Sequence, residues 1–445
     1  MQVREANSGI ESGECQEIEI RTARSLPEIE ALRESWLAWP SHRDSDIDFY
    51  LMILQAYPEV VRPHVSALYR NGKPEAILVG RLERKIFTFK LGYLPILRSS
   101  SRCLTFVYGA IHGNGSPENT ELLVGEVMKC LKQGEADVAM LEFVPLTSPL
   151  YHLAIQLPGT LSRDILPKPQ GHQVMVVPDS IDEVYRQMSH ARRKDVRRNV
   201  RKLQTHPSGP PKIICYRNTS EFDRLFHDVE EIAQKTYQRG LGAGFADTPD
   251  VRMRLDLAAR KGWLRAYVLY VGDEPCAFWI GMLYGEIFVG EYTGYDPAFR
   301  DFSPGMFLMM QVIEGFCGGV HDTVKEVDFG LGNAEYKAAL CGKNWIEATV
   351  FIFGPTLRGV TLKGMRTMTV MADVCARRVL ASTKLLPRLK RAWRDRLAQN
   401  AQAQSKSKNS GTDPMARAAA PPEASSQGFP EAKNHEAIDC DHLLE

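Results

Sequence analysis

The same order of secondary-structure signals occurs twice along this chain, and that repetition constrains its fold more than any other feature. In the first copy, apolar residues at helical spacing occupy 25–39 and 46–57. Alternating apolar runs on both sides of Asn71-Gly72 then predict a β-hairpin, because this dipeptide favours a tight turn. A strand, a helix over 119–134 and another strand complete the copy. Helices that alternate with strands in this way indicate a layered α/β unit.

The second copy follows the same order. Helical patterns at 180–204 and 220–240 precede three strand-like runs that are joined by two glycine turns. A helix over 303–319 and a short strand follow. We therefore predict an α/β fold made of two tandem domains, each a mixed sheet flanked by helices. The prediction rests on the order of the elements, since few residues are identical between the two copies.

The length of 445 residues fits two ordinary globular domains with extensions. The predicted segments are a polar lead-in at 1–24, a degenerate first domain at 25–172, a second domain at 173–355, a basic helical extension at 356–400 and a disordered tail at 401–445. The tail is rich in Ala, Ser, Pro, Gln and Lys. Such a segment cannot bury enough apolar surface to offset the entropy lost on ordering.

Composition narrows the class of protein. The formal net charge is only +1, so the whole chain gives no electrostatic argument for nucleic acid or membrane binding. The nine cysteines are odd in number, widely spaced and without a C-x-x-C pair, which favours reduced thiols over disulfides or a metal site. A polar N-terminus and the lack of a long apolar run predict a cytoplasmic protein, with attachment to a membrane surface as an open alternative.

One helix start has the features of a phosphate-binding site. Ser303 suits the N-cap and Pro304 the first helical position, and Gly305 leaves room for close approach of a ligand. Unpaired N–H groups and the positive end of the helix dipole favour phosphate at such a place. The alternative is an ordinary capped helix, since this cap is widespread.

The stretch "VDFGLGNAEYKAAL" is the second informative motif. A buried strand ends at Asp328, Gly330 and Gly332 form a flexible turn, and Tyr336 and Lys337 follow. The third glycine of a dinucleotide-binding fingerprint is missing, and no phosphate-binding P-loop sequence occurs. A strand-to-helix turn with a surface Tyr-Lys pair is the simpler alternative.

Taken together, the two motifs resemble a known family. The ordered string from a tyrosine-rich strand through Ser-Pro-Gly and an apolar helix to Asp-Phe-Gly-x-Gly and Tyr-Lys resembles the C-terminal domain of the BioF2-like (CelD-type) acetyltransferases. These belong to the GNAT superfamily and are related in architecture to the FemAB transferases. The resemblance is clearest over 189–353. It implies a GNAT fold in both copies and acetyl-CoA or another acyl-CoA as donor, with no metal.

The resemblance also implies where the donor binds. The corresponding residues are Arg300, Ser303, Pro304, Gly305, Met306, Gly330 and Gly332. In GNAT enzymes a glycine-rich loop holds the donor's pyrophosphate, whereas here Gly305 is the only glycine between Arg300 and Gly305. The first copy matches the family more loosely and is therefore the degenerate one.

Acyl transfer to an amine requires a base, groups that stabilise the oxyanion, and a proton for the leaving thiolate. Glu291 and Asp328 are the candidate bases, although a structural carboxylate is an equal alternative for both. Tyr336 is the candidate donor of the leaving-group proton. Lys337 is expected to stabilise negative charge on the oxyanion or on the donor phosphates.

The acceptor is expected to meet a basic helix and several tyrosines. Arg193 and Arg197 lie at i, i+4 spacing on "HARRKDVRRNVRKLQ" and are predicted to bind an anionic acceptor together with Tyr237, Tyr292 and Tyr295. A solvated basic face is the alternative. Binding of tRNA, as in the FemAB relatives, is disfavoured because one helix without interleaved aromatic residues is a weak signal for RNA.

The basic extension at 356–400 mixes arginines and lysines with leucines, which suits either an anionic membrane surface or a helix packed on the second domain. The sequence as a whole predicts an N-acyltransferase. Relatives of the resembled family are associated with exopolysaccharide or cellulose production, so the predicted acceptor is an amine or amino sugar of an envelope precursor. Two alternatives stay open: an aminoacyl-tRNA-dependent FemAB-like transferase, and a non-catalytic scaffold of a polysaccharide-synthesis complex.

Overall fold

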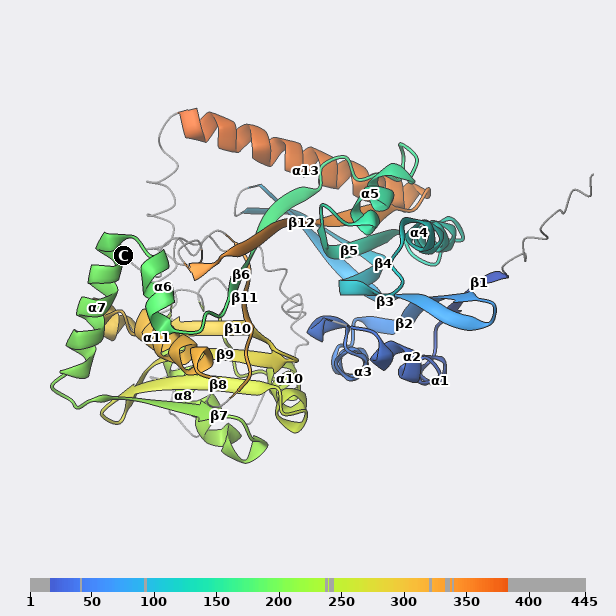
Figure 1. Ribbon diagram of the computed structural model, residues 1–445. Coiled ribbons are helices and arrows are strands. Elements are labelled where there is room, and N and C mark those ends of the chain that lie inside the picture. Colours follow the sequence, from blue (N-terminus) through green and yellow to red (C-terminus); the bar gives the residue numbers. More distant parts are fainter. Residues whose placement is uncertain are drawn as a thin grey trace, which may run out of the picture.

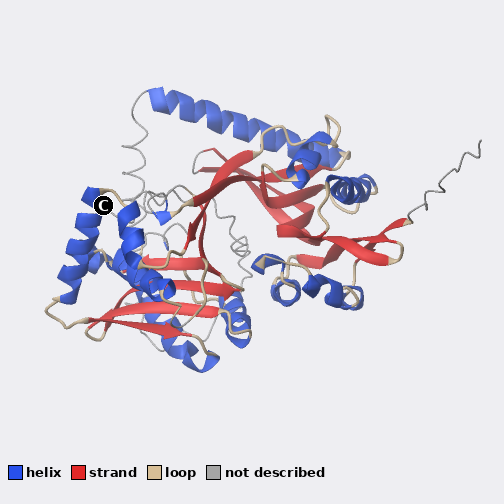
Figure 2. Cartoon of the chain, in the orientation of Figure 1, coloured by secondary structure: helices blue, strands red, loops and turns tan. Residues whose placement is uncertain are grey.

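The structure is a computed structural model that describes residues 17–382 with gaps at 41, 92–93, 237–238, 240–243, 320–321, 333–336 and 338–339. The described strands form one twelve-stranded mixed sheet in the order β1-β2-β3-β4-β5-β12-β6-β11-β10-β9-β8-β7 (Figure 1). Helices flank this sheet (Figure 2). The predicted α/β fold with a mixed sheet and two copies of one element order is therefore confirmed.

The first copy contains six strands in the described residues. Its elements are β1 (Ile18–Ala23), α1 (Leu26–Glu30), α2 (Arg33–Ala38), η1 (Arg43–Ser45), α3 (Ile47–Ala56), β2 (Val60–Arg70), β3 (Lys73–Leu91), β4 (Leu94–Gly113), α4 (Pro117–Lys132), β5 (Val138–Pro145), α5 (Pro149–Gln156) and β6 (Lys168–Val176). β1 falls inside the predicted polar lead-in and pairs with β2, so that segment is partly structured. The Asn71-Gly72 hairpin is confirmed, with positive φ at both residues.

The second copy and the extension follow. Their elements are α6 (Ile181–Gln187), α7 (His190–Gln204), β7 (Pro211–Tyr216), η2 (Thr219–Glu221), α8 (Phe222–Lys235), α10 (Pro249–Arg260), β8 (Leu264–Val271), β9 (Glu274–Tyr284), β10 (Ile287–Tyr295), η3 (Pro297–Phe302), α11 (Pro304–Cys317), β11 (Glu326–Leu331), β12 (Lys343–Phe353) and α13 (Leu357–Ser382). The single helix predicted over 180–204 is wrong. Met188 is extended and Ser189 accepts the N–H of Arg192, so a new helix begins there.

The last strands of the two copies exchange places in the sheet. β12, which ends the second copy, pairs with β5 of the first copy and with β6. β6, which ends the first copy, pairs with β12 and with β11 of the second copy. Figure 1 shows the green β6 and the brown-orange β12 side by side between the two halves. The division at residue 172 stays a prediction, and it falls within β6.

Both copies contain a pair of parallel strands that separate partway along their length. β4 and β5 pair only from Cys103 with Val138 to Phe106 with Leu141. β10 and β11 pair only from Ile287 with Glu326 to Val289 with Asp328. Beyond these points the facing backbone groups no longer bond to each other, so each gap offers peptide donors and acceptors. The helix α4 follows β4 after a short loop, and α11 follows β10 after the 3₁₀ turn η3.

The hydrophobic cores lie between the sheet and these helices. In the second copy, α11 packs its apolar side chains against one face of the sheet, and α8 and α10 cover the other. The gap between β10 and β11 thus opens from a densely packed scaffold, so the residues around it are held in fixed positions.

Candidate functional site

The predicted phosphate cradle at the start of α11 differs from its expected form. Ser303 adopts a left-handed conformation and makes no capping hydrogen bond. Its hydroxyl instead accepts a hydrogen bond from the Asn199 side-chain amide at 2.9 Å. Ser303 is the N-cap residue of α11, as predicted, but its side chain does not cap the helix, because its hydroxyl binds Asn199 of α7. Pro304 does occupy the first helical position.

The other predicted donor-binding residues are placed differently. A Cβ added to Gly305 would lie 3.7 Å from the Tyr295 ring, so the backbone there stays accessible to a ligand. Met306 buries its side chain in the core, so only its backbone N–H could face a donor. Arg300 is exposed at the end of η3. The donor-binding set stays a prediction, with the helix N-terminus as its centre.

Glu291 bridges the two copies. It lies in a β-bulge of β10, its side chain is 6% exposed, and it forms ion pairs with Arg43 of η1 and with Arg254 of α10, the latter at 2.8 Å. Arg254 also donates to the Tyr292 hydroxyl at 3.0 Å. Two guanidinium groups stabilise the ionised carboxylate and make it a weak base. These contacts are those expected of a structural carboxylate, which is the alternative to a catalytic base at Glu291.

Asp328, the other candidate base, is buried next to a histidine. Its carboxylate accepts hydrogen bonds from His172 Nε2 at 2.8 Å and from the Gly330 N–H at 2.6 Å. Burial opposes ionisation of Asp328, but the bond and charge of His172 outweigh it and hold the pKa of this carboxyl below its ordinary value. Burial likewise opposes protonation of His172, yet Asp328 and the neighbouring Glu347 raise the pKa of the imidazole to about 9. The pair is thus an ion pair at neutral pH.

An aromatic stack holds this ion pair in place. The rings of Tyr108 and Trp345 both lie nearly parallel to the His172 ring, at centroid distances of 5.9 and 4.4 Å. Glu347 accepts hydrogen bonds from the Tyr108 hydroxyl at 2.8 Å and from the Trp345 indole N–H. These residues come from β4, β6 and β12, and we name them together with Asp328 the seam cluster.

Lys337 is buried, which rules out the alternative of a surface lysine at this position. Its ammonium donates to the carbonyl oxygens of Phe329 and Leu331 at 2.8 and 2.7 Å. The glycine turn it holds has positive φ at Gly330 and Gly332, and the Gly332 N–H donates to the Gly171 carbonyl. Lys337 therefore fixes the turn that follows Asp328. Tyr336, the candidate proton donor, lies outside the described residues.

The predicted acceptor-binding arginines lie on α7, which packs against η3 and α11. Arg193 donates to the Met188 carbonyl at 3.2 Å, and the Arg197 guanidinium lies over the Tyr185 ring and 3.8 Å from Asp182. This helix is therefore next to the predicted donor end of the site. Tyr237 lies outside the described residues, and no finding tests the acceptor assignment of Tyr292 or Tyr295.

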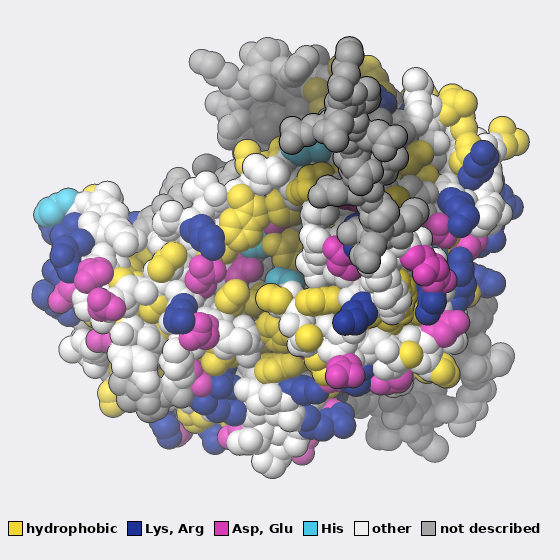
Figure 3. Space-filling model, turned by 45° about the vertical axis from the view of Figure 1, so that its right-hand side comes forward, with side chains coloured by type: hydrophobic (Ala, Val, Ile, Leu, Met, Phe, Trp, Pro, Cys, Tyr) yellow, Lys and Arg dark blue, Asp and Glu magenta, His cyan; other side chains and the backbone are white. Residues whose placement is uncertain are grey.

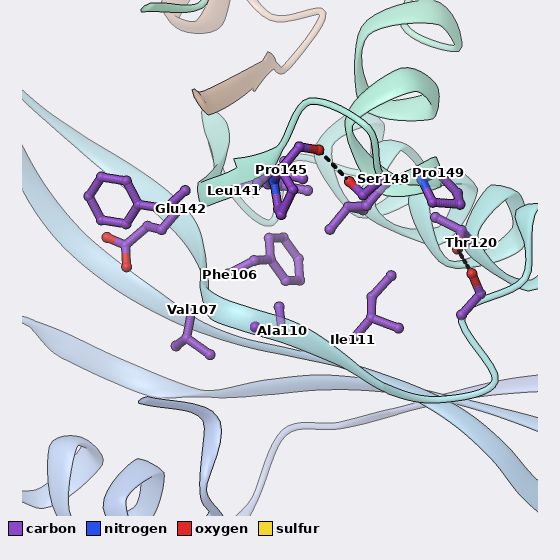
Figure 4. A pocket seen from close by; sticks show the side chains of 15 residues that line it. Phe106, Val107, Ala110, Ile111, Thr120, Leu141, Glu142, Pro145, Ser148 and Pro149 are labelled. Carbon is purple, nitrogen blue, oxygen red and sulfur yellow. Dashed lines mark hydrogen bonds between the residues drawn. The ribbon is translucent and has the colours of Figure 1, made fainter. Parts of the chain in front are cut away.

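A cavity of about 200 Å³ opens in the first copy where β4 and β5 separate (Figure 4). Its wall is mostly apolar and includes Phe106, Ala110 and Leu141. The hydroxyls of Thr120 and Ser148 at its rim donate to backbone carbonyls. The cavity occupies the same position in its copy as the gap between β10 and β11. Across the described residues, no group of three or more His, Cys, Asp or Glu side chains could hold a metal ion.

The chain is similar to several solved structures. A tandem GNAT protein from the clavulanic acid biosynthesis pathway has 13% identity and a TM-score of 0.42, over 76% of this chain and 99% of that one. FemX has 11% identity and a TM-score of 0.41, over 65% and 88%. A conserved protein of unknown function from Bacteroides thetaiotaomicron has 11% identity and a TM-score of 0.43, over 72% and 97%.

No curated protein matches the chain. Residues 190–338 match the family of acetyltransferase (GNAT) domains. The matched stretch begins at α7, contains the separating strands β10 and β11 with α11 between them, and ends just after Lys337. The match to the acetyltransferase (GNAT) domain family thus lies within the second copy of this protein.

Proposed function

We propose that the protein is an N-acyltransferase that moves an acyl group from acyl-CoA to an amine. The observation that carries this proposal is the separation of β10 from β11 in the segment that leads through η3 to the N-terminus of α11, inside the matched stretch. In the reaction, the amine nitrogen bonds to the thioester carbonyl carbon and the carbon–sulfur bond breaks. The amine loses a proton to a base, and the leaving thiolate gains one.

The electrostatics around α11 support a donor that carries phosphates. The α11 N-terminus provides backbone N–H groups and the positive end of a helix dipole. The neighbouring α7 is strongly cationic and is joined to Ser303 through Asn199. Its basic residues are Arg192, Arg193, Lys194, Arg197, Arg198, Arg201 and Lys202. A positive surface of this kind raises the local concentration of an anionic ligand.

We expect Gly305→Glu to weaken binding of acetyl-CoA at least about tenfold, because an ionised side chain at the helix N-terminus repels phosphate. The substitution should leave the fold intact, since a carboxylate in the first helical turn is favourable. Gly315→Glu, near the other end of α11 where an added Cβ meets nothing within 4 Å, is the matched control. Calorimetry with acetyl-CoA and longer acyl-CoAs measures both variants.

The same titration locates the donor in one copy. Ala110→Phe fills the cavity between β4 and β5 without touching α11. If this variant loses acetyl-CoA binding while Gly305→Glu keeps it, the donor site lies in the first copy and our assignment of Gly305 is wrong. If the wild-type chain binds no acyl-CoA and binds charged tRNA, the FemAB-like alternative replaces our proposal.

The acceptor that we propose is an amine or amino sugar of an envelope or exopolysaccharide precursor. This rests on the resemblance to the BioF2-like and CelD-type enzymes. A non-catalytic scaffold of a polysaccharide-synthesis complex is the rival. It would keep its cellular phenotype when Gly305 is replaced by glutamate, whereas an enzyme would lose it together with CoA binding.

We further propose a cytoplasmic protein that touches an anionic membrane surface through α13. One face of this helix packs Leu362 on the sheet, while Leu357, Met368 and Met371 are 86, 73 and 55% exposed. Exposed apolar residues next to arginines suit such a surface. In the part of the chain that the structure describes, no helix has the length and apolarity to span a bilayer. The portion of the predicted extension after 382 lies outside the described residues.

We expect the double variant Met368→Glu and Met371→Glu to reduce co-sedimentation with vesicles that contain anionic lipid. The two carboxylates remove apolar contact with the membrane and are repelled by its negative charge. The attraction of one lysine or arginine to such a surface is worth about 1 kcal/mol, and each carboxylate should oppose binding by a similar amount. Leu37→Glu, on the exposed face of α2 in the first copy, is the control and should bind as the wild type does. Equal sedimentation of all three proteins would refute the membrane contact.

A further inference from the structure

Glu347 on β12 is a fully buried carboxylate whose two oxygens have different surroundings. Oε1 accepts from Tyr108 and Trp345 and lies 3.3 Å from His172 Nδ1. Oε2 is buried and has no hydrogen-bond partner among the described residues. Burying a carboxylate oxygen without a partner is unfavourable, and native structures pair nearly all such atoms. The site is therefore complete only when a donor from a ligand or solvent reaches Oε2.

The position of Glu347 connects it to the reaction. His172 links it to Asp328, and Asp328 is the last residue of β11 that pairs with β10 before those strands separate. Two polar contacts thus join Glu347 to the gap that the donor is proposed to enter. Figure 3 looks onto the seam between the two halves, where hydrophobic side chains surround histidine and acidic ones.

The charge and the rings of the seam cluster favour a cation. Two carboxylates, Asp328 and Glu347, face one imidazolium, His172, so the cluster carries an excess negative charge. Tyr108 and Trp345 are half-buried and present aromatic rings beside that charge. An ammonium group is attracted both by the carboxylate and by the faces of such rings.

We propose that Glu347 binds the acceptor amine as its ammonium and then accepts its proton. This inference rests on the proposed acyl transfer and names the acceptor class, a primary amine that is cationic at neutral pH. A proton passes from the ammonium to Oε2, which leaves a neutral amine and a carboxylic acid. The amine nitrogen then bonds to the thioester carbonyl carbon, the carbon–sulfur bond breaks, and a second N–H proton goes to the sulfur. Glu347 returns its proton to solvent.

The other two acidic candidates are less suited to this role. Glu291 is paired with two guanidinium groups, and Asp328 is paired with the His172 imidazolium. Each is held as a carboxylate by full positive charges, which lowers its tendency to accept a proton. Glu347 uses Oε1 for all its contacts: this oxygen accepts hydrogen bonds from a phenol and an indole and lies 3.3 Å from His172 Nδ1, a longer separation than the 2.8 Å between His172 and Asp328. Its second oxygen is the one positioned to take a proton.

The test uses the full chain with acetyl-CoA and three cationic amines of different shape: glucosamine, ethanolamine and lysine methyl ester. Release of CoA thiol gives the rates, and calorimetry gives the affinity for acetyl-CoA. We expect Glu347→Gln to lower kcat/KM for the accepted amine by about 10²–10⁴-fold, the range for loss of a general base. Its affinity for acetyl-CoA should stay within about twofold of the wild-type value, since Glu347 is not in the donor site.

Two matched variants separate a chemical role from a structural one. Glu314→Gln changes an exposed carboxylate at the far end of α11 and should leave the rates unchanged. Glu347→Asp keeps the carboxylate and should recover part of the lost rate. The deficit of Glu347→Gln should also narrow from about pH 6 to about pH 8, because more amine is already neutral. His172 and Tyr108 contact Glu347, and Asp328 lies behind His172. His172 titrates above this window, its pKa being raised to about 9.

The outcomes are distinguishable. If the wild-type chain binds acetyl-CoA and Glu347→Gln acylates amines at the wild-type rate, the inference is overturned while the proposed function stands. The inference also fails if acetyl-CoA binds but none of the three cationic amines causes release of CoA. It fails as well if glucose, which lacks the ammonium group, competes for the site as strongly as glucosamine does. If the wild-type chain does not bind any acyl-CoA, the proposed function itself fails.

Discussion

Replacing Asp328 with asparagine should destabilise the protein by about 1–3 kcal/mol, because it removes one of the two carboxylates that stabilise the buried His172 imidazolium. Asp328 and His172 are both more than nine-tenths buried, so solvent screens their interaction little. The pKa of His172, which is raised to about 9, should fall towards its ordinary value in this variant. Urea unfolding measures the loss of free energy of unfolding, and histidine NMR signals followed with pH measure the titration.

The pH dependence of stability gives the same prediction a second readout. The pKa of His172 is raised in the folded protein, so its contribution is full below the ordinary histidine pKa of about 6.5 and is lost as pH rises through about 9. The pKa of Asp328 is lowered, so its contribution is present above the ordinary value and is lost as pH falls through the folded pKa. The wild-type protein should therefore lose stability on the alkaline side, and Asp328→Asn should lose much less there.

Asp322→Asn is the matched control for this experiment. Asp322 is a similarly buried carboxylate of the second copy, and it accepts a paired set of hydrogen bonds from Arg265 at 2.6 and 2.8 Å. Its removal should also destabilise the fold, yet leave the titration of His172 unchanged. An unchanged His172 pKa in Asp328→Asn would show that the two side chains do not interact in solution.

Much of the fold follows from local signals in the sequence. The hairpin at Asn71-Gly72 and the helix after Ser303 are encoded by neighbouring residues, and the structure confirms both. The strand predicted to end at Asp328 instead continues to Leu331, because Gly330 and Leu331 pair with β6. The absence of a capping bond from the Ser303 side chain could not be predicted, because the hydroxyl binds Asn199, which is 104 residues away in the chain. The Ser303 hydroxyl bonds this distant side chain instead of a backbone N–H of the first helical turn, which is its usual partner at an N-cap.

The seam cluster could not be predicted for a similar reason. Tyr108, His172 and Glu347 meet only because β6 and β12 exchange places between the copies, and no local pattern reports such an exchange. One weak signal exists: Trp345 and Glu347 alternate on one face of a strand, and a carboxylate that faces a sheet core needs partners. Tyr108 belongs to the first copy, so a site that combines residues of both copies cannot be found from the sequence of the second copy alone.

Stability and turnover measurements on Glu291 variants can distinguish a structural carboxylate from a catalytic one. Glu291→Ala should destabilise the protein by about 3–5 kcal/mol, because it leaves the largely buried guanidinium groups of Arg43 and Arg254 facing each other without the anion between them. Arg43 belongs to the first copy and Arg254 to the second, so the loss should weaken the contact between the two halves. Urea unfolding with probes in each copy would show whether the halves begin to unfold separately.

A double-mutant cycle isolates the bridge from other effects of the substitution. Arg43→Met removes one cation while keeping much of the side-chain volume, and in the absence of Glu291 it should cost less than in its presence. A coupling energy of about 0.5–3 kcal/mol is the range for contacting residues. Glu291→Gln tests the alternative that Glu291 is the catalytic base, because it keeps the shape of the side chain and removes its charge. If that variant unfolds like the wild type and loses turnover by about 10²-fold or more, Glu291 is the base, and the two arginines serve to position it.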